Sequence, residues 1–319
     1  MQHYDVFNGD ADGLCALHQL RLAEPRESVL VTGVKRDIAL LAKVPVEDCA
    51  SATVLDISMD KNSAALNSLL DAGKTIHYVD HHHPGDIPKH PNLRANIDIS
   101  PTTCTSLLVD HELQGRYRAW AVAAAFGDNL LQSAREAAAP LNLSEQQLAT
   151  LERLGTLINY NGYGASLDDL FFAPADLYRQ MQPFADPLAF AAEGETYSTL
   201  DQGYNEDMAQ AEALQSSDRG DKHAIYIFPD ARWARRVSGV YANTLVHSAP
   251  AKAHAILTAK PDGGYLVSVR APLDNRTGAD ALVRQFETGG GRAAAAGINH
   301  LPEADLERFS AALQAQYTP

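Results

Sequence analysis

The first third of the chain alternates between short apolar runs and stretches with helical periodicity. The apolar runs lie at 3–7, 28–32, 52–57 and 75–80. The helical periodicities lie at 14–23 and 62–72. Strands that alternate with helices at this spacing are typical of βαβ units. The pattern therefore predicts an N-terminal α/β domain with a parallel sheet.

The rest of the chain divides into a helical part and a second region with strand patterns. Helices are predicted at 104–113, at 117–127 and at several places over 131–215. Strand patterns return at 223–228, 253–259 and 264–270, and helical patterns follow at 278–287 and 303–316. The polar stretch 201–222 is typical of a linker. We therefore predict a first domain over 1–200, with its helical extension from about 131, and a smaller α/β domain over 223–319.

Composition and charge narrow the possible classes of protein. The 319 residues carry a net charge of −14, and residues 1–215 hold 14 Lys and Arg against 30 Asp and Glu. That balance excludes a broad basic surface for long nucleic acid. The three cysteines form no C-x-x-C pair, which argues against a disulfide framework or a structural zinc site. No apolar run approaches the ~20 residues of a membrane span, and the N-terminus lacks the pattern of a secretory signal. We expect a cytoplasmic protein with no membrane partner.

Acidic and histidine residues follow three of the predicted strands. Asp10 and Asp12 come after the first run, Asp56 lies at the end of 52–57, and Asp80, His81 and His82 begin where 75–80 ends. Carboxyl ends of parallel strands share one edge of a sheet, so these groups are expected to converge. Asp128, after a helix of small residues, offers another oxygen. Oxygen and imidazole ligands suit manganese, which lowers the pKa of a bound water and holds a phosphoryl oxygen.

Each of these signals has a simpler interpretation when taken alone. Asp-x-Asp-Gly is often a turn, Asp56 could cap the next helix, and successive histidines are often a solvated loop. Their joint occurrence at three strand ends favours a metal site. A calcium-binding EF-hand loop is excluded, because no ligands follow Asp12 at the required spacing.

The same residues resemble a known family. Asn8-Gly9-Asp10-Ala11-Asp12-Gly13, Leu55-Asp56, Asp80-His81-His82 and Gly127-Asp128 resemble the four motifs of the DHH phosphoesterase superfamily. That superfamily includes RecJ-type exonucleases, nanoRNases, cyclic-dinucleotide phosphodiesterases and pyrophosphatases. The run from Gly289 to Gly297, with Val267 to Arg270 before it, resembles the DHH-associated domain. The resemblance implies a parallel-sheet DHH domain, a C-terminal α/β DHH-associated domain and an active site in the interdomain cleft.

The resemblance also implies roles for individual residues of the first domain. One metal position would be held by Asp10, Asp56, His81 and Asp128. A second position is expected to be weaker, because Asn8 stands where the family has an aspartate, so we expect one firm Mn²⁺ and a weaker second one. Asp12 would reach the metal through water, His82 would contact the scissile phosphate, and Asp80 would orient a histidine.

In the second domain the resemblance points to the substrate. Arg270 matches an arginine that grips the substrate, although on spacing alone it could be an exposed charge at a strand end. The backbone of Gly289, Gly290 and Gly291 would approach a phosphate or a base, although a glycine triplet is more often a flexible turn. Arg292 replaces the family's histidine and would bind phosphate.

Together these observations predict a metal-dependent phosphodiesterase that hydrolyses short oligonucleotides or linear dinucleotides, such as pGpG, to mononucleotides. Long DNA is not expected as a substrate, because a basic groove is lacking. The alternatives are a cyclic-dinucleotide phosphodiesterase, a single-strand exonuclease, a 3′-phosphoadenosine 5′-phosphate phosphatase and a non-catalytic nucleotide-binding protein. A homodimer is left open.

Overall fold

The computed structural model describes residues 1–317, which fall into two compact units. The first unit comprises residues 1–202 and the second begins at residue 203. Helix α9 (Glu195–Glu212) contains this boundary, so the first half of the stretch predicted as a linker, 201–222, is helical. No helix among residues 1–317 is both long and apolar enough to pass through a membrane.

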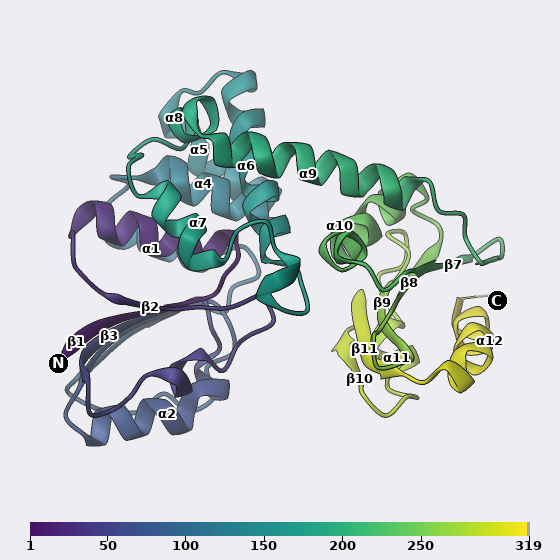
Figure 1. Ribbon diagram of the computed structural model, residues 1–319, viewed down its shortest axis with the longest axis horizontal. Coiled ribbons are helices and arrows are strands. Elements are labelled where there is room, and N and C mark those ends of the chain that lie inside the picture. Colours follow the sequence, from purple (N-terminus) through teal and green to yellow (C-terminus); the bar gives the residue numbers. More distant parts are fainter. Residues whose placement is uncertain (318–319) are drawn as a thin grey trace. The chain divides into compact units, whose positions relative to one another are not determined.

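The first unit is built on a parallel sheet (Figure 1). Within the described residues this sheet has five strands in the order β2-β1-β3-β4-β5. They are β1 (Gln2–Phe7), β2 (Val29–Val31), β3 (Cys49–Leu55), β4 (Thr75–Asp80) and β5 (Leu93–Ile97). All neighbours pair in parallel, so the carboxyl ends of the strands share one edge. The predicted parallel sheet is confirmed, and β5 is an additional, partly exposed edge strand whose polar sequence gave no strand pattern.

Helices cover both faces of this sheet (Figure 1). On one face, α2 (Met59–Asp71) packs Leu66, Leu69 and Leu70 against Val54 and Tyr78 of the strands. On the other, α1 (Ala11–Ala23) contacts a helical layer, as the Ala- and Leu-rich sequence predicts. That layer comprises α3 (Thr105–Glu112), α4 (Arg118–Gly127), α5 (Leu131–Ala138), α6 (Glu145–Gly162), α7 (Pro174–Met181) and α8 (Pro187–Glu193).

The second unit contains a mixed sheet, which within the described residues has six strands in the order β10-β11-β9-β8-β7-β6. Its strands are β6 (Asp218–Arg219), β7 (His223–Phe228), β8 (Ala253–Ala259), β9 (Tyr265–Arg270), β10 (Gly289–Arg292) and β11 (Ala295–Leu301). Its helices are α10 (Arg232–Ser248), α11 (Ala279–Val283) and α12 (Leu306–Tyr317). Strands β7 and β8 are parallel, and the remaining pairs are antiparallel. The α/β class of this unit is confirmed.

The second unit differs locally from the sequence predictions. Helix α10 was not predicted, because the arginines of its first turns obscure an apolar face that includes Val237, Tyr241 and Leu245. The helix predicted at 278–287 ends at Val283. The glycine triplet 289–291 is part of edge strand β10 rather than a flexible turn. A Cβ on Gly289 would lie 1.7 Å from the Val283 carbonyl oxygen, so glycine permits this close approach.

A glycine contact fixes the spacing of α4 and α6 in the first unit. A Cβ on Gly155 would lie 1.9 Å from the carbonyl oxygen of Ala123, and one on Gly127 would lie 2.9 Å from the carbonyl oxygen of Gly155. The two helix backbones therefore meet directly. Because Asp128 follows α4 as its C-cap residue, this contact also positions the Asp128 carboxylate.

We predict that Gly155→Ala destabilises the protein by ~1–3 kcal/mol, because the added methyl group must push the two helices apart. Urea unfolding of the metal-free protein measures the change. Gly290→Ala is the control, since nothing lies within 4 Å of a Cβ there. Equal stabilities of the two variants would contradict this account of the helix contact.

Candidate metal centre

The acidic residues singled out in the sequence do converge at the carboxyl edge of the parallel sheet. Asn8 and Asp10 follow β1, Asp56 follows β3, and His81 follows β4. The side chains of Asn8, Asp10 and Asp56 are almost fully buried, with exposures of 5%, 3% and 2%. The edge therefore concentrates carboxylates that have lost most of their hydration.

The turn after β3 aims Asp56 into this cluster. Asp56 has a left-handed backbone with φ of 58°, which aspartate adopts more readily than most residues. Its amide donates to the carbonyl oxygen of Val79, 3.1 Å away, which ties the turn to β4. The Thr105 hydroxyl donates to Asp56 Oδ1 at 3.3 Å. The Asp56 carboxylate is thus held in place from two sides: β4 fixes the backbone of its turn, and Thr105 of α3 bonds the side chain.

Asp10 and Asp12 each cap the N-terminus of a helix. Asp10 Oδ1 accepts the amides of Asp12 and Gly13 at 3.1 Å, at the start of α1. The two oxygens of Asp12 accept the amides of Thr105 and Ser106 at 2.7 and 2.6 Å, at the start of α3. Helix N-termini stabilise negative charge, so both carboxylates are partly compensated. The sequence did not indicate that Asp12 holds α3; its expected contact to a metal through water stays a prediction.

His81 lies among the carboxylates. Its Nε2 is 3.4 Å from Asp56 Oδ1, 3.7 Å from Asp128 Oδ2 and 3.9 Å from Asp12 Oδ2. Its Nδ1 lies 3.2 Å from the carbonyl oxygen of Thr103. Because only a protonated Nδ1 can donate to that carbonyl, the neutral ring turns the Nε2 lone pair toward the acids. This is the arrangement of a metal-ligating histidine.

His82 forms a pair with Asp80. His82 Nδ1 lies 2.7 Å from Asp80 Oδ1 and 4.0 Å from Asp56 Oδ1. Asp80 is fully buried, whereas the His82 side chain is 46% exposed. Burial lowers the pKa of His82, but Asp80 outweighs this effect and raises the pKa above its ordinary value. The structure thus joins the two residues that the sequence singled out as phosphate-contacting and orienting groups.

The charges of the cluster act on one another. Burial, followed by the charges of Asp10 and Asp12, raises the pKa of Asp56 well above its ordinary value. Burial, aided by Asp12 and Asp10 and opposed by Lys35, raises the pKa of Asp128 to about 6. Burial alone would raise the pKa of Asp10 as well, but the Lys35 ammonium lowers it to about 2. Without a bound cation, simultaneous ionisation of all these carboxylates is therefore energetically unfavourable.

Lys35 is the residue of this cluster that the sequence analysis missed. Its Nζ lies 2.6 Å from Asp10 Oδ2 and 3.5 Å from Asp128 Oδ1. Lys35 lies in the loop after β2, which neighbours β1 in the sheet. A cation shortly after a predicted strand, facing acids after other strands, is the signal that could have identified it.

The donor set fits a divalent cation. Carboxylate oxygens and imidazole nitrogens are suitable ligands for manganese and similar metals. The groups Asp56, His81, His82 and Asp12, His81, Asp128 each bring their ligand atoms within 4.8 Å of one another. Among the described residues, the buried Oδ1 of Asn8 has no hydrogen-bond partner, so it too is available as a ligand.

The residues predicted at the substrate end lie together in the second unit. Arg270 of β9 and Arg292 of β10 both pair with Ala295 of β11, one from each side. Two strand spacings place their Cα atoms about 10 Å apart. Arg270 Nε donates to Asn243 Oδ1, and its Nη1 donates to Ser268 Oγ, each at 3.0 Å. The guanidinium is therefore held in position at the end of its strand.

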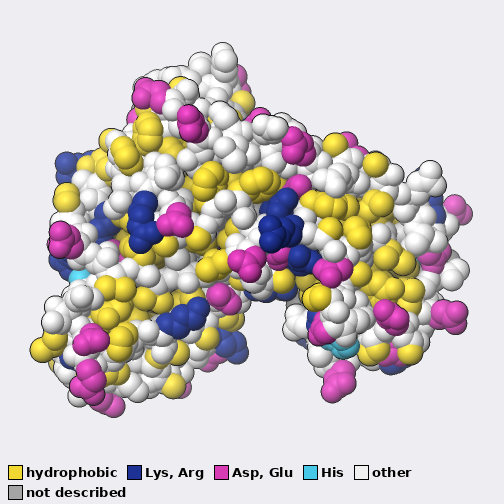
Figure 2. Space-filling model, viewed as in Figure 1, with side chains coloured by type: hydrophobic (Ala, Val, Ile, Leu, Met, Phe, Trp, Pro, Cys, Tyr) yellow, Lys and Arg dark blue, Asp and Glu magenta, His cyan; other side chains and the backbone are white. Residues whose placement is uncertain are grey.

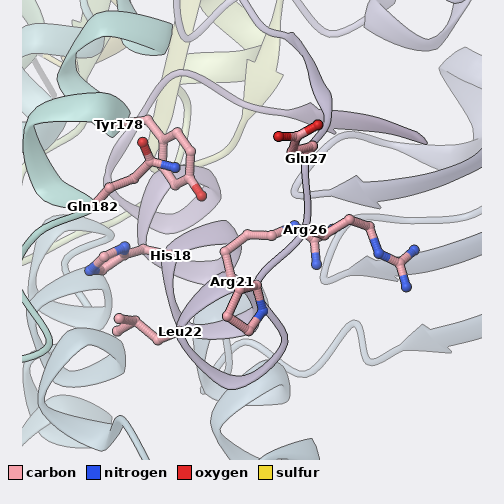
Figure 3. Close-up of a pocket in the computed structure, with 8 residues that line it drawn as sticks. His18, Arg21, Leu22, Arg26, Glu27, Tyr178 and Gln182 are labelled. Carbon is pink, nitrogen blue, oxygen red and sulfur yellow. The ribbon is translucent and has the colours of Figure 1, made fainter. Parts of the chain in front are cut away.

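A separate hollow of about 520 Å³ lies beside the last turn of α1, at the opposite end of that helix from Asp10 (Figure 3). His18 and Arg21, two of its polar lining residues, have partners within the protein. His18 Nε2 is bonded to the Phe184 carbonyl oxygen at 2.8 Å, and Arg21 Nε donates to Asp5 Oδ2 at 2.9 Å. Burial lowers the pKa of His18 to about 4, so the ring is neutral. We therefore assign His18 and Arg21 a structural role in the first unit and no role in a reaction.

We predict that Asp128→Asn stabilises the metal-free protein at pH 7 by ~1–3 kcal/mol, because a carboxyl with a raised pKa must ionise against its surroundings. A folded-state pKa of about 6 means that this penalty grows as the pH rises from about 4 to about 6. Urea unfolding at pH 4 and pH 7 measures the effect, which should vanish at pH 4. Exposed Asp71→Asn is the control, and a gain that is equal at both pH values would contradict the assignment.

Comparison with known proteins was made by sequence and by structure. No family model and no curated protein matched the chain. Solved structures did match. A RecJ exonuclease bound to manganese shares 19% identity over 98% of this chain and 89% of its own, with a TM-score of 0.64.

Two further solved structures matched over nearly the whole of this chain. RecJ from Thermus thermophilus, in complex with Mn²⁺, has a TM-score of 0.60 at 19% identity, and this chain spans about half (52%) of it. The pGpG-specific phosphodiesterase PggH of Vibrio cholerae has a TM-score of 0.58 at 13% identity, with 99% of this chain and 98% of PggH covered. The protein therefore has the fold of RecJ and PggH, as its resemblance to the DHH phosphoesterase superfamily implies, and the four motifs of that resemblance meet at one edge of its parallel sheet.

Proposed function

We propose that this protein is a metal-dependent phosphodiesterase that hydrolyses short oligonucleotides or linear dinucleotides, such as pGpG, to mononucleotides. One observation carries the proposal. His81 Nε2 lies close to carboxylate oxygens of both Asp56 and Asp128, in a fold that is shared with RecJ and PggH. Buried carboxylates that are held this close together repel one another, and this repulsion favours binding of a cation at a fixed place.

Each residue of the cluster has a role in this proposal. Asp56, His81 and Asp128 would hold a manganese ion. Asp10, which lies 2.6 Å from the Lys35 ammonium, and Asn8 would line the weaker second position. A bound Mn²⁺ supplies Lewis-acid chemistry, which lowers the pKa of water and polarises a phosphoryl oxygen.

The pair of His82 and Asp80 would act on the substrate itself. Asp80 raises the pKa of His82 and accepts from its Nδ1, which stabilises the protonated ring. The ring is exposed enough to meet a phosphate and to donate to it from Nε2. In this arrangement His82 would neutralise charge on the transferring phosphoryl group, and Asp80 would hold it in place.

Charge and comparison both support a short substrate. On the face shown in Figure 2, the basic side chains of residues 1–202 stand in separate small groups among acidic, apolar and uncharged ones. A long strand gains most of its affinity from a continuous basic track, which is lacking on that face. The near end-to-end match with PggH, a pGpG-specific enzyme, supports a dinucleotide. Arg270 and Arg292 would then bind a phosphate of the substrate.

A single-strand exonuclease is the second candidate, since two RecJ structures share the fold. The substrates separate the candidates. A dinucleotidase releases mononucleotides from pGpG or pApA, whereas an exonuclease requires longer strands. Cyclic dinucleotides and 3′-phosphoadenosine 5′-phosphate, assayed side by side, test the remaining possibilities, and a non-catalytic binding protein would turn over none of them.

We predict that manganese-dependent turnover of pGpG or pApA falls at least about a thousandfold in Asp56→Ala, because the change removes a central metal ligand. Product analysis by chromatography measures it. Exposed Asp71→Ala, on α2, is the matched control. Turnover by Asp56→Ala within severalfold of the wild type would refute the site.

Substrate length gives a second prediction. On 5′-phosphorylated RNAs of about two to twenty nucleotides, kcat/KM should be highest for two to about four and fall beyond. The reason is that residues 1–215 carry 14 Lys and Arg against 30 Asp and Glu, so a longer strand gains little electrostatic attraction. Arg270→Ala should lower kcat/KM on the dinucleotide. The corresponding activation free energy should rise by ~1.5–3 kcal/mol, because one charge-assisted contact is lost. Mn²⁺ binding should not change. Exposed Arg284→Ala is the control, and a rate that rises with length would favour the exonuclease.

A further inference from the structure

Lys35 is built into the acidic cluster by contacts from several elements. Its ammonium lies 2.6 Å from Asp10 Oδ2, 3.5 Å from Asp128 Oδ1 and 2.9 Å from Asn159 Oδ1 of α6. It also lies 5.6 Å from the centre of the Tyr163 ring, a cation–π contact. The ammonium thus bridges the carboxylates that follow β1 and α4.

The backbone of Lys35 is fixed as firmly as its side chain. The Lys35 amide donates to the carbonyl oxygen of Gly162 at 2.8 Å. The Lys35 carbonyl oxygen accepts from Asn8 Nδ2 at 3.1 Å. An exposed lysine that meets an acid by chance has no such frame. Asn8, a neutral residue at the acidic edge, therefore anchors the lysine while its own Oδ1 stays unpartnered.

The charges of the cluster can be balanced with this lysine included. The carboxylates of Asp10, Asp12, Asp56 and Asp128 carry four negative charges when ionised. Lys35 and one divalent ion supply three positive charges. The N-termini of α1 and α3, which Asp10 and Asp12 cap, supply about half a charge each. The cluster is then neutral with a single divalent ion, and a second one would leave it with an excess of positive charge.

We propose that the Lys35 ammonium takes the place of a divalent cation on the Asp10 side of the cluster, so that the protein loads one metal ion, on the His81 side. The two groups of potential ligands agree with this division, because both contain His81 and neither contains Asp10. The inference rests on the proposed metal site and adds to it a determinant of metal number. Lys35 acts here on metal loading and is not assigned a contact with the substrate.

The test is calorimetric titration of the metal-free, full-length protein with MnCl₂. The wild type should bind one Mn²⁺ per chain. Lys35→Met, which keeps the length of the side chain and removes its charge, should bind two, because Asp10 and Asp128 lose their cation. Lys35→Arg keeps the charge and should bind one. Lys61→Met, an exposed lysine beside Asp60, is the control and should also bind one.

Thermal unfolding gives a readout that does not depend on stoichiometry. Without metal, Lys35→Met should melt below the wild type, and saturating Mn²⁺ should raise its Tm by more than it raises that of the wild type. If Lys35→Met does not fold, Lys35→Gln decides. That change keeps a hydrogen-bond donor for Asp10 and Asn159 and removes the charge, so it should bind two Mn²⁺ for the same reason as Lys35→Met.

The outcomes distinguish this inference from the proposed function. Two equally tight ions in the wild type, or one ion with unchanged affinity in Lys35→Met, would overturn the role of Lys35 and leave the metal site in place. A single ion with unchanged affinity in Lys35→Gln, where Lys35→Met does not fold, would also overturn it. A wild type that binds no Mn²⁺ would overturn both.

Discussion

Repulsion among buried carboxylates at one edge of the parallel sheet is the constraint on which the rest of the first unit depends. A parallel sheet brings the ends of its strands together, and this sequence places an acid after several of them. Two kinds of positive group offset the repulsion: the helix N-termini at Asp10 and Asp12, and the Lys35 ammonium. Burial and the repulsion that is not offset raise the pKa values of Asp56 and Asp128.

The surrounding packing serves to hold this charge arrangement in place. Direct contact of α4 and α6 at their glycines sets the position of Asp128. The left-handed turn at Asp56 and the Asp80–His82 pair fix two further groups. Since each group is held by a different element, a cation bound here would add a further link between elements that hydrogen bonds and the Lys35 ion pairs already join.

The sequence predicted those parts of the structure that depend on local patterns. Apolar runs identified β1 to β4 of the first unit and β7 to β9 of the second. The rule that parallel strands end at one edge brought Asp10, Asp56 and His81 together. It failed where tertiary contacts decide. The polar β5 is a strand because β4 pairs with it. The Arg-rich start of α10 obscures the buried face of that helix. Gly289 lies in a strand because β10 pairs with β11, at a place where Val283 leaves no room for a side chain. Lys35 belongs to no motif, since its role arises from where β2 lies in the sheet.

The bond between Asp12 and α3 has a consequence for the order of folding. Asp12 and Thr105 are 93 residues apart in the chain. The acidic loop after β1 therefore does not form its geometry alone. It also needs α3, which lies far away in the sequence, to bind the Asp12 carboxylate. Such contacts cost loop-closure entropy and form late. A cation would therefore bind at this edge only once the first unit has folded, and an isolated peptide with the same aspartates would not reproduce the site.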